Sequence, residues 1–232
     1  MKTFTTAVAA AAMFAAVAPA SAATINFTTG SLPTWTGGGV TVTVAGRTIL
    51  STGTTTVTAA NSTVYDSTVQ KWDQGLGVSN GWFDAAGTTE HTTDNRSGYD
   101  YIRLDFDKAV SLTGMTLNAF ALPGNNGALD KDAWVSFSNT GSFADALANQ
   151  KAYTSNAGAD GVFPSFANTF SKTWVIGAAL TPQERNDAFK LAGISFNVAA
   201  VPEPATWAMM LVGFGLVGGA LRRRGIGKLA SA

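Results

Sequence analysis

The feature that most limits the possible folds is an uncharged segment near the C-terminus. It covers residues 205–221 and is followed directly by Arg222, Arg223 and Arg224. As a helix it would be about 25 Å long, near the lower limit for crossing a bilayer. Its glycines would weaken a helix in water, which disfavours the alternative of a buried core helix. The segment therefore predicts one transmembrane helix over 205–221, followed by a basic stop-transfer tail over 222–232.

The N-terminus has the three parts of a secretory signal peptide. Lys2 supplies a positive charge, residues 7–17 are apolar, and Ala20 and Ala22 form an Ala-x-Ala site. Small residues at these two positions fit a signal peptidase. The sequence therefore predicts a signal peptide helix over 1–22, cleaved after Ala22. The alternative is an alanine-rich first helix of the fold.

The zero formal net charge of the 232-residue chain conceals an uneven distribution. Residues 23–201 carry ten basic and fourteen acidic side chains, so the body is mildly acidic. The basic tail predicts a cytoplasmic end and a body outside the inner membrane. No nucleic-acid partner is expected, because the body lacks a basic excess. The absence of cysteine excludes disulfides, cysteine-based zinc sites, iron–sulfur clusters and thiol catalysis.

The body, residues 23–200, has the size of a single sandwich or barrel. Short alternating or β-branched segments are separated by Gly, Asn, Asp and Ser, which is typical of strands and turns. In the clearest segment, Ile102, Leu104 and Phe106 point to one face. We predict a mainly β body, an antiparallel β-sandwich of jelly-roll-like type. Its expected strands are 24–28, 40–44, 54–58, 101–106, 115–121, 133–137, 173–176 and 194–198.

Helices are expected to be few. Thr181, Pro182 and Glu184 form a capping box with proline at the first helical position, which predicts a helix from Thr181 to about Lys190. Residues 143–150 are expected to form one or two further helical turns.

The tail resembles the PEP-CTERM sorting signal in its Pro-Glu-Pro-x-x-Trp-Ala form. The residues that carry the resemblance are Pro202, Glu203, Pro204, Trp207 and Ala208, followed by the apolar segment and the three arginines. One departure is the extension after the arginines, which is longer than is usual in the family. The resemblance implies a sorting signal over 201–232, with its motif at 202–204.

The same resemblance implies partners and a location. The tail would be recognised by an exosortase, a membrane-embedded peptidase or transpeptidase, after a signal peptidase has acted. The precursor would be anchored in the inner membrane of a Gram-negative bacterium. Its body would then reach the cell surface or an extracellular matrix of exopolysaccharide and biofilm. Two prolines around one residue hold an extended backbone that a protease cleft can bind, so the motif is interpreted as a substrate.

A second, less specific resemblance covers residues 72–120. Gly-Leu-Gly-Val after Trp72, the pair Asp94 and Asn95, and the strand at 101–106 are similar to the bodies of other proteins with this type of tail. The resemblance implies a β-sandwich surface domain and brings no catalytic residues with it.

Catalysis finds little support in the sequence. His91 is the only histidine and lies in a polar loop, so a solvated side chain is the simpler interpretation. A Ser-His-Asp triad would require it, and no Gly-x-Ser-x-Gly elbow is present. A hydrolase would instead need Asp94, Asp105 and Asp130 together at one cleft.

Carboxylates allow a second kind of site. Asp130 and Asp132, at i and i+2, share a face if they lie on a strand. Together with Asp94 and Asn95 they are candidate ligands of a structural calcium ion, because calcium prefers oxygen ligands. The alternative is that these residues form solvated turns. No other cofactor is expected.

Tryptophans suggest a carbohydrate-binding surface. Trp134 alternates with Ser136 and opposes Val135 in an expected strand, which places it on an outer face, and Trp72 and Trp82 flank a glycine-rich segment. Aromatic rings can stack on sugars, and the alternative is that most of these tryptophans are core residues. The leading hypothesis is a non-enzymatic exported surface or matrix protein. The alternative is a carbohydrate-binding β-sandwich, with or without structural calcium, and a hydrolase ranks third.

Overall fold

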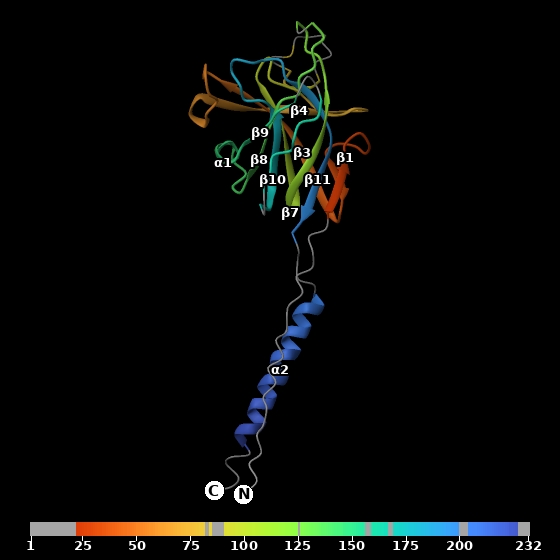
Figure 1. Ribbon diagram of the computed structural model, residues 1–232, viewed down its shortest axis with the longest axis vertical. Helices are drawn as coiled ribbons and strands as arrows, with labels where there is room; N and C mark the ends of the chain where they lie inside the picture. The colour runs from red at the N-terminus through yellow and green to blue at the C-terminus, as the bar shows by residue number, and fades with distance from the viewer. Residues whose placement is uncertain are drawn as a thin grey trace. The chain divides into compact units, whose positions relative to one another are not determined.

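The computed structural model of the chain describes residues 22–81, 84, 91–124, 126–155, 159–166, 169–199 and 204–226. Contacts divide the chain into one unit of residues 20–199 and a second unit formed by the two ends. The described part of the second unit is helix α2, Pro204–Ile226. Figure 1 shows the β-rich body and this helix. The predicted signal peptide and Ala20 lie outside the described residues, and Ala22 is the first residue of strand β1.

Strands provide most of the regular secondary structure of the body. Within its described residues, the helical elements are the short helix α1, Phe143–Ala148, and one 3-10 turn, Ala59–Asn61. The strands, in chain order, are β1 Ala22–Asn26, β2 Thr34–Gly37, β3 Val40–Ser51, β4 Ser62–Trp72, β5 Gly75–Ser79, β6 Thr93–Asp94, β7 Tyr99–Ala119, β8 Ala133–Ser138, β9 Lys151–Tyr153, β10 Ser171–Ala178 and β11 Ala188–Val198.

Strand β7 organises the body because it pairs with three other strands. Its first half, residues 99–106, pairs with β3 along one edge and with β10 along the other. Its second half, residues 110–119, pairs with β11. β11 in turn pairs with β5, β5 with β4 and β4 with β3, so these five strands close a barrel. β8 and β9 extend the sheet beyond β10, while β1 and β6 add to β11 and β2 adds to β3.

The mainly β, antiparallel architecture is as predicted, but a jelly-roll sandwich is not confirmed. The two expected strands 101–106 and 115–121 are one strand of 21 residues. Its pairing with β11 shifts register between Leu191 and Gly193 and again between Ser195 and Phe196. Such irregularities bend and twist paired strands. The long strand β7 can therefore pair with β3 in its first half and with β11 in its second half, which allows the sheet to close into a barrel.

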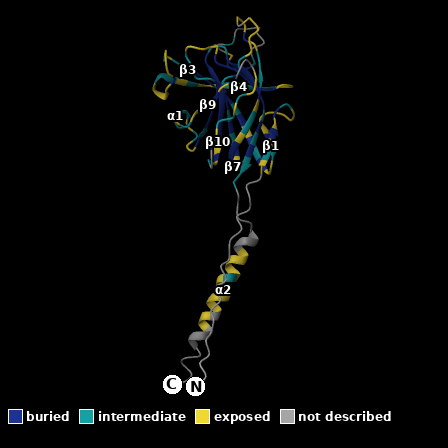
Figure 2. Ribbon diagram, in the orientation of Figure 1, coloured by how far each residue is buried: buried dark blue, intermediate teal, exposed yellow. Residues whose placement is uncertain are grey.

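Two hydrophobic clusters lie on opposite faces of the sheet formed by β7, β8 and β10. The larger cluster includes Leu104 and Trp174, and Figure 2 shows buried residues concentrated in the middle of the body. The smaller includes Tyr101, Trp134 and Val175, which alternate along their strands with Ile102, Val135 and Trp174 of the larger cluster. Helix α1 packs on this second face through Phe143 and Ala146. Strand alternation thus supplies both clusters, and α1 covers the second.

Most of the expected strands are present, and two expectations are wrong. Residues 54–58 form no strand, because Thr58 caps the 3-10 turn through its side chain and Val57 is buried in the smaller cluster. The predicted helix from Thr181 is also absent. Its first residues form a turn in which the Glu184 amide donates to the Thr181 carbonyl at 3.1 Å. From Ala188 the chain is strand β11.

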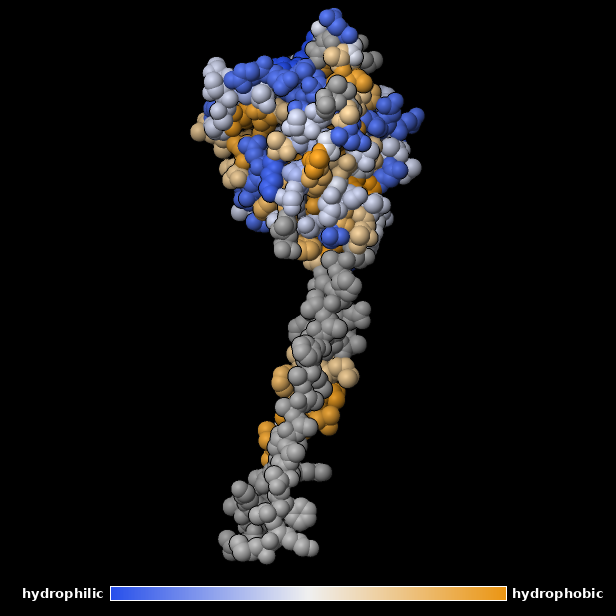
Figure 3. All heavy atoms as spheres, viewed as in Figure 1, coloured by the Kyte–Doolittle hydropathy of each residue, from blue (hydrophilic) through white to orange (hydrophobic). Residues whose placement is uncertain are grey.

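Helix α2 exposes apolar side chains along its described length. Leu211, Phe214 and Leu216 are 68%, 70% and 70% exposed, and Figure 3 shows the described part of the helix as hydrophobic. On the body, the same view shows hydrophobic areas that are small and separated by hydrophilic ones. Among the described residues, no helix combines the length and apolar character that crossing a membrane requires. The transmembrane span over 205–221 stays a prediction.

Candidate functional site

The predicted sorting motif lies at the start of helix α2. Pro202 and Glu203 fall outside the described residues, and Pro204 is the first residue of the helix. Proline is favoured there because its missing N–H group would have no partner in the first turn. The backbone of Trp207 and the exposed Ala208 lie within the first two turns. The motif is thus divided between the residues before the helix and its first turns.

The basic residues lie at the other end of the same helix. Arg222 is exposed, and the helix continues past the backbones of Arg223 and Arg224 to Ile226. Positive side chains are favourable at the C-terminal end of a helix, where the carbonyl groups give a partial negative charge. Helix α2 therefore carries the end of the motif, the apolar segment and the basic cluster in the order predicted from the sequence.

In the body, the structure brings three carboxylates together. Asp130 and Asp132 precede β8, and Asp187 precedes β11. One oxygen of each carboxylate lies within 4.8 Å of the other two. Asp130 and Asp132 were predicted as ligands of one site. Asp187 was not, because its segment was assigned to a helix; the alternation of buried Phe189 and Leu191 after it is the signal that indicates a strand start there.

Asn95 joins this carboxylate cluster, and Asp94 does not. The Asn95 amide donates to Asp187 Oδ2 at 2.5 Å, and the Asp187 N–H donates to Asn95 Oδ1 at 3.1 Å. The Asp94 carboxylate instead accepts from the Thr92 hydroxyl at 3.1 Å and from the Arg96 N–H at 3.0 Å. Asp94 and Asn95, which the sequence predicted as ligands of one site, therefore have different hydrogen-bond partners, and only Asn95 contacts the cluster.

Asp130 and Asp132, which are partly exposed, accept hydrogen bonds from neighbouring polar groups. The Ser155 N–H donates to Asp132 Oδ1 at 2.6 Å, and the Ser155 hydroxyl donates to Asp130 Oδ1 at 3.3 Å. The Asn186 amide donates to Asp130 Oδ2 at 3.1 Å. Asp187 itself is fully buried, and its Oδ1 has no hydrogen-bond partner. Burial and the neighbouring charges, Asp130 first, raise the pKa of Asp187 to about 8.

A second buried carboxyl group, Asp100, lies on β7. It is 1% exposed and its Oδ1 accepts from the Thr48 hydroxyl at 2.5 Å and from the Asn80 amide at 3.3 Å. Its Oδ2 is buried without a partner. Burial, and then the charge of Asp94, raise the pKa of Asp100 well above its ordinary value. A group of this kind favours the protonated form, because the charged form loses its hydration.

The three candidate sugar-stacking tryptophans have different fates. Trp134 lies on the predicted outer face, but it is 2% exposed, because Tyr101 and helix α1 cover that face. The expectation of an exposed ring is therefore wrong. Gly177 on the neighbouring strand leaves room for this indole, since a Cβ there would lie 2.3 Å from its Nε1. Trp82 lies outside the described residues.

Trp72 is the candidate that remains at the surface. It is 40% exposed, but its ring stacks on His91 with centroids 4.8 Å apart, and Lys190 Nζ lies 4.7 Å from its centroid. His91 is half-buried in this stack rather than solvated as predicted. Lys190 is 8% exposed, and burial lowers its pKa. The ring therefore has partners within the chain itself.

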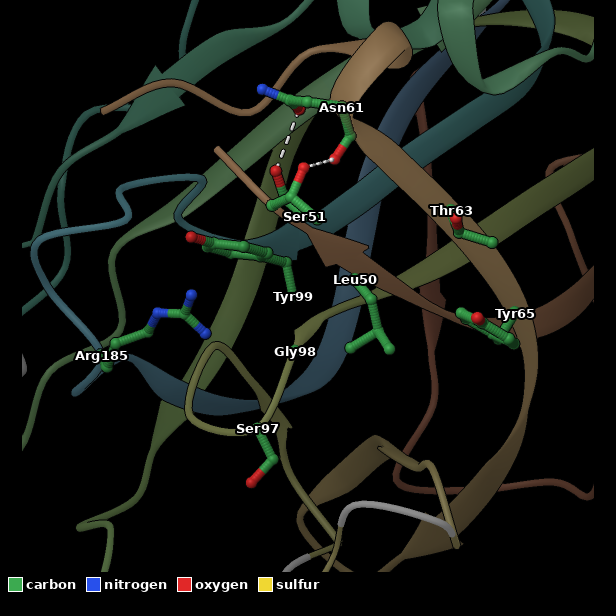
Figure 4. Close-up of a pocket in the computed structure, with 10 residues that line it drawn as sticks. Leu50, Ser51, Asn61, Thr63, Tyr65, Ser97, Gly98, Tyr99 and Arg185 are labelled. Carbon is green, nitrogen blue, oxygen red and sulfur yellow. Dashed lines mark hydrogen bonds between the residues drawn. The ribbon is translucent and has the colours of Figure 1, made fainter. Parts of the chain in front are cut away.

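A pocket of about 430 Å³ lies between β3, β4 and the start of β7 (Figure 4). Tyr99 and Arg185 line one side and Tyr65 the other. The Arg185 guanidinium stands 4.5 Å from the Tyr99 ring centroid, and Tyr65 is 46% exposed. The remaining lining residues are mainly polar: Leu50, Ser51, Thr52, Asn61, Thr63, Ser97 and Gly98. Sequence reasoning missed this pocket, because its residues come from four separated segments.

The predicted hydrolase carboxylates do not gather at this pocket. Asp105 pairs with Arg103 at 2.8 Å and accepts from the Thr173 hydroxyl at 2.8 Å. Asp130 lies in the carboxylate cluster instead. The structure thus gives these two residues separate surroundings.

Comparisons with known proteins concern the tail. A family model, the PEP-CTERM protein-sorting motif, matches residues 200–224. The match confirms the resemblance found in the sequence and marks the chain as an exported protein that an exosortase processes. No curated protein and no solved structure matches.

Proposed function

Because the chain carries a PEP-CTERM protein-sorting motif at residues 200–224, we propose that it is a non-enzymatic surface or biofilm-matrix protein. The observation that carries the proposal is the match at residues 200–224, within which one helix, α2, runs from the last residue of the Pro-Glu-Pro motif through the apolar segment to the basic end. The body is the cargo. After export, helix α2 holds the precursor in the inner membrane of a Gram-negative bacterium, and exosortase cleavage delivers the body to the exopolysaccharide.

The apolar character of α2 supports the membrane stage of this proposal. Its described side chains include Leu211, Phe214 and Leu216, which are all more than half exposed. Exposed apolar surface of this kind marks a site that is covered by a partner or by lipid. The arginines at its end favour the cytoplasmic side. The body would then lie on the opposite side of the membrane, where an exported chain belongs.

The sufficiency of the tail tests the proposal. Residues 199–232 would be fused to a periplasmic reporter protein and expressed in a host with an exosortase of matching type. We expect the reporter to shorten by about the mass of the tail and to leave the inner-membrane fraction. Immunoblots of cell fractions with a reporter antibody measure both effects. A reporter that keeps its tail in the exosortase host, as it does in an exosortase deletion strain, would refute the proposal.

Carbohydrate binding by the body is a second candidate function, favoured by the pocket in Figure 4. Its lining combines an exposed aromatic ring, Tyr65, with hydroxyl, amide and guanidinium groups. An aromatic face with a few placed hydrogen-bonding groups is suited to a sugar. In this function the pocket, rather than the tryptophans predicted from the sequence, binds the glycan.

Two aromatic residues of strand β4 allow specific binding in the pocket to be distinguished from nonspecific adsorption. Tyr65 lines the pocket and Trp72 does not, although both are exposed to a similar extent. We expect Tyr65→Ala to weaken binding of the full chain to the producer's exopolysaccharide by about tenfold, the loss expected for one stacked ring. Trp72→Ala should leave binding unchanged. Isothermal titration with the purified polysaccharide measures both, and equal affinities for the two variants would refute the assignment.

A further inference from the structure

We propose that Asp130, Asp132 and Asp187 bind one calcium ion that fastens the turn before β11 to the segment before β8. The carboxylate cluster brings three negative groups to one place, with one oxygen from each residue within 4.8 Å of the others. The inference is independent of the sorting signal, because all three residues belong to the body.

The first argument is that the cluster lacks a positive partner within the described residues. Lys131 stands between two of the carboxylates in sequence, but its ammonium group donates to the Leu117 carbonyl at 3.0 Å and to Asp160 at 2.7 Å. Arg185, two residues before Asp187, donates to the Asn95 carbonyl at 3.1 Å and lies over Tyr99. Both neighbouring cations are therefore engaged elsewhere. Like charges at such short separation repel unless a cation or a proton joins them.

The second argument is the state of Asp187. Its side chain is fully buried, and Oδ2 accepts from the Asn95 amide. Oδ1 is buried with no hydrogen-bond donor as long as the carboxyl groups are ionised, and a proton on Asp187 shared with Asp130 is the partner that a cation would replace. A buried acceptor that lacks a donor costs about 1–3 kcal/mol. A cation bound among the three carboxylates supplies the missing partner of this oxygen.

The third argument concerns which cation fits. Two oxygens that each lie about 2.4 Å from one calcium ion stand at most about 4.8 Å apart. The three carboxylates meet this limit as they stand. Magnesium demands a regular octahedron and usually keeps several waters, so a set of three protein carboxylates suits the more adaptable calcium better. A ligand set made only of oxygen atoms disfavours zinc, which prefers nitrogen and sulfur.

Calcium binding would stabilise the start of β11, a strand that is needed to close the barrel. The cluster lies directly before β11, which is the strand that joins β7 to β5. Asn95 connects the cluster to the segment before β7, and Arg185 connects the same turn to the pocket in Figure 4. One ion would therefore connect the segments that precede β7, β8 and β11.

The test is a thermal unfolding measurement on the full chain, purified in a mild detergent and freed of metal with EDTA. We expect 5 mM CaCl₂ to raise the Tm by at least 3 °C, and 5 mM MgCl₂ to raise it by less than 1 °C. Calcium titration followed by calorimetry should give one site per chain with a Kd in the micromolar to millimolar range. No calcium-dependent change in Tm, or an equal response to magnesium, would overturn the proposal.

Variants locate the ion. Asp132→Asn keeps an oxygen that can accept from the Ser155 N–H, so it should fold and lose most of the calcium-dependent rise in Tm. Asp73→Asn removes an exposed carboxylate outside the cluster and should keep the full rise. If Asp132→Asn does not fold, Asp130→Asn serves in its place with the same expected loss. A full calcium response in the folded cluster variant would place the ion elsewhere and overturn the proposal.

Discussion

Replacing Pro202, Glu203 and Pro204 with alanine is expected to abolish processing of the chain by its exosortase. The precursor should accumulate at its full length after removal of the signal peptide, and none of the body should reach the surface fraction. The physical reason is that prolines prevent helical hydrogen bonding. Three alanines would allow helix α2, which begins at Pro204, to start earlier in the chain, whereas a protease cleft binds an extended backbone.

The matched control for this experiment lies within the body. Residues Pro182, Gln183 and Glu184 also contain one proline and one glutamate, and they form a turn rather than a helix. Their replacement with alanine should leave processing unchanged. Immunoblots of membrane, periplasmic and surface fractions, with the mass of the released product, provide the measurement. Normal processing of the Pro202–Pro204 variant would show that the motif is not what the peptidase recognises.

Asp100→Asn is expected to raise the stability of the body at neutral and alkaline pH. An asparagine oxygen can accept from Thr48 and Asn80 as the carboxylate does, and the amide carries no charge to bury. Relieving one buried and partly unpartnered charged group is worth about 2 kcal/mol. For a domain of this size, that corresponds to a rise in Tm of about 4–8 °C.

The pH dependence gives this prediction its sign. The pKa of Asp100 in the folded chain lies well above the ordinary value of 3.8, so the folded state binds the proton more tightly than the unfolded state. The stability that this proton provides is fully present below pH 3.8 and is lost as the pH rises through the folded pKa. The advantage of Asp100→Asn should therefore be near zero at pH 3.5 and grow with increasing pH.

Thermal unfolding from pH 3.5 to pH 9, in the presence of EDTA, measures this difference. Asp73→Asn, which changes an exposed carboxylate, is the control and should follow the wild type throughout. If the difference in Tm between wild type and Asp100→Asn were constant across the whole pH range, the pKa of Asp100 would not be raised in the folded chain, and the prediction would be wrong.

Strands with one apolar face were predictable, and strands without such a face were not. Residues 101–106 were found because Ile102, Leu104 and Phe106 alternate with less buried positions, and the structure buries all three. Strand β4 was missed because its side chains are mostly polar and only partly buried. Its place is set by pairing with β3 and β5. Pairing between distant segments has no local signature in the chain.

Local signals misled where tertiary contacts were stronger. The capping box at Thr181 is a real helix-start pattern, but the residues that follow are drawn into the sheet and the carboxylate cluster. Asp187 was therefore missed as a site residue, although Asp130 and Asp132 were found. The apolar tail needed no such contacts, since order along the chain defines the sorting signal. This difference explains why the sorting signal was predictable from the sequence and the strand pairing of the body was not.

The place of β11 at the end of the body has a consequence for the timing of folding. β11 closes the barrel by pairing with β7 and β5, and it ends at Val198, shortly before the sorting motif. A chain that crosses the membrane from its N-terminus presents this strand last, so the ring cannot close until nearly all of the body has emerged. Closure by such distant segments is also slow. Cleavage near the motif, however, would remove none of these strands, so the released body would keep all the strand pairings that it formed after export.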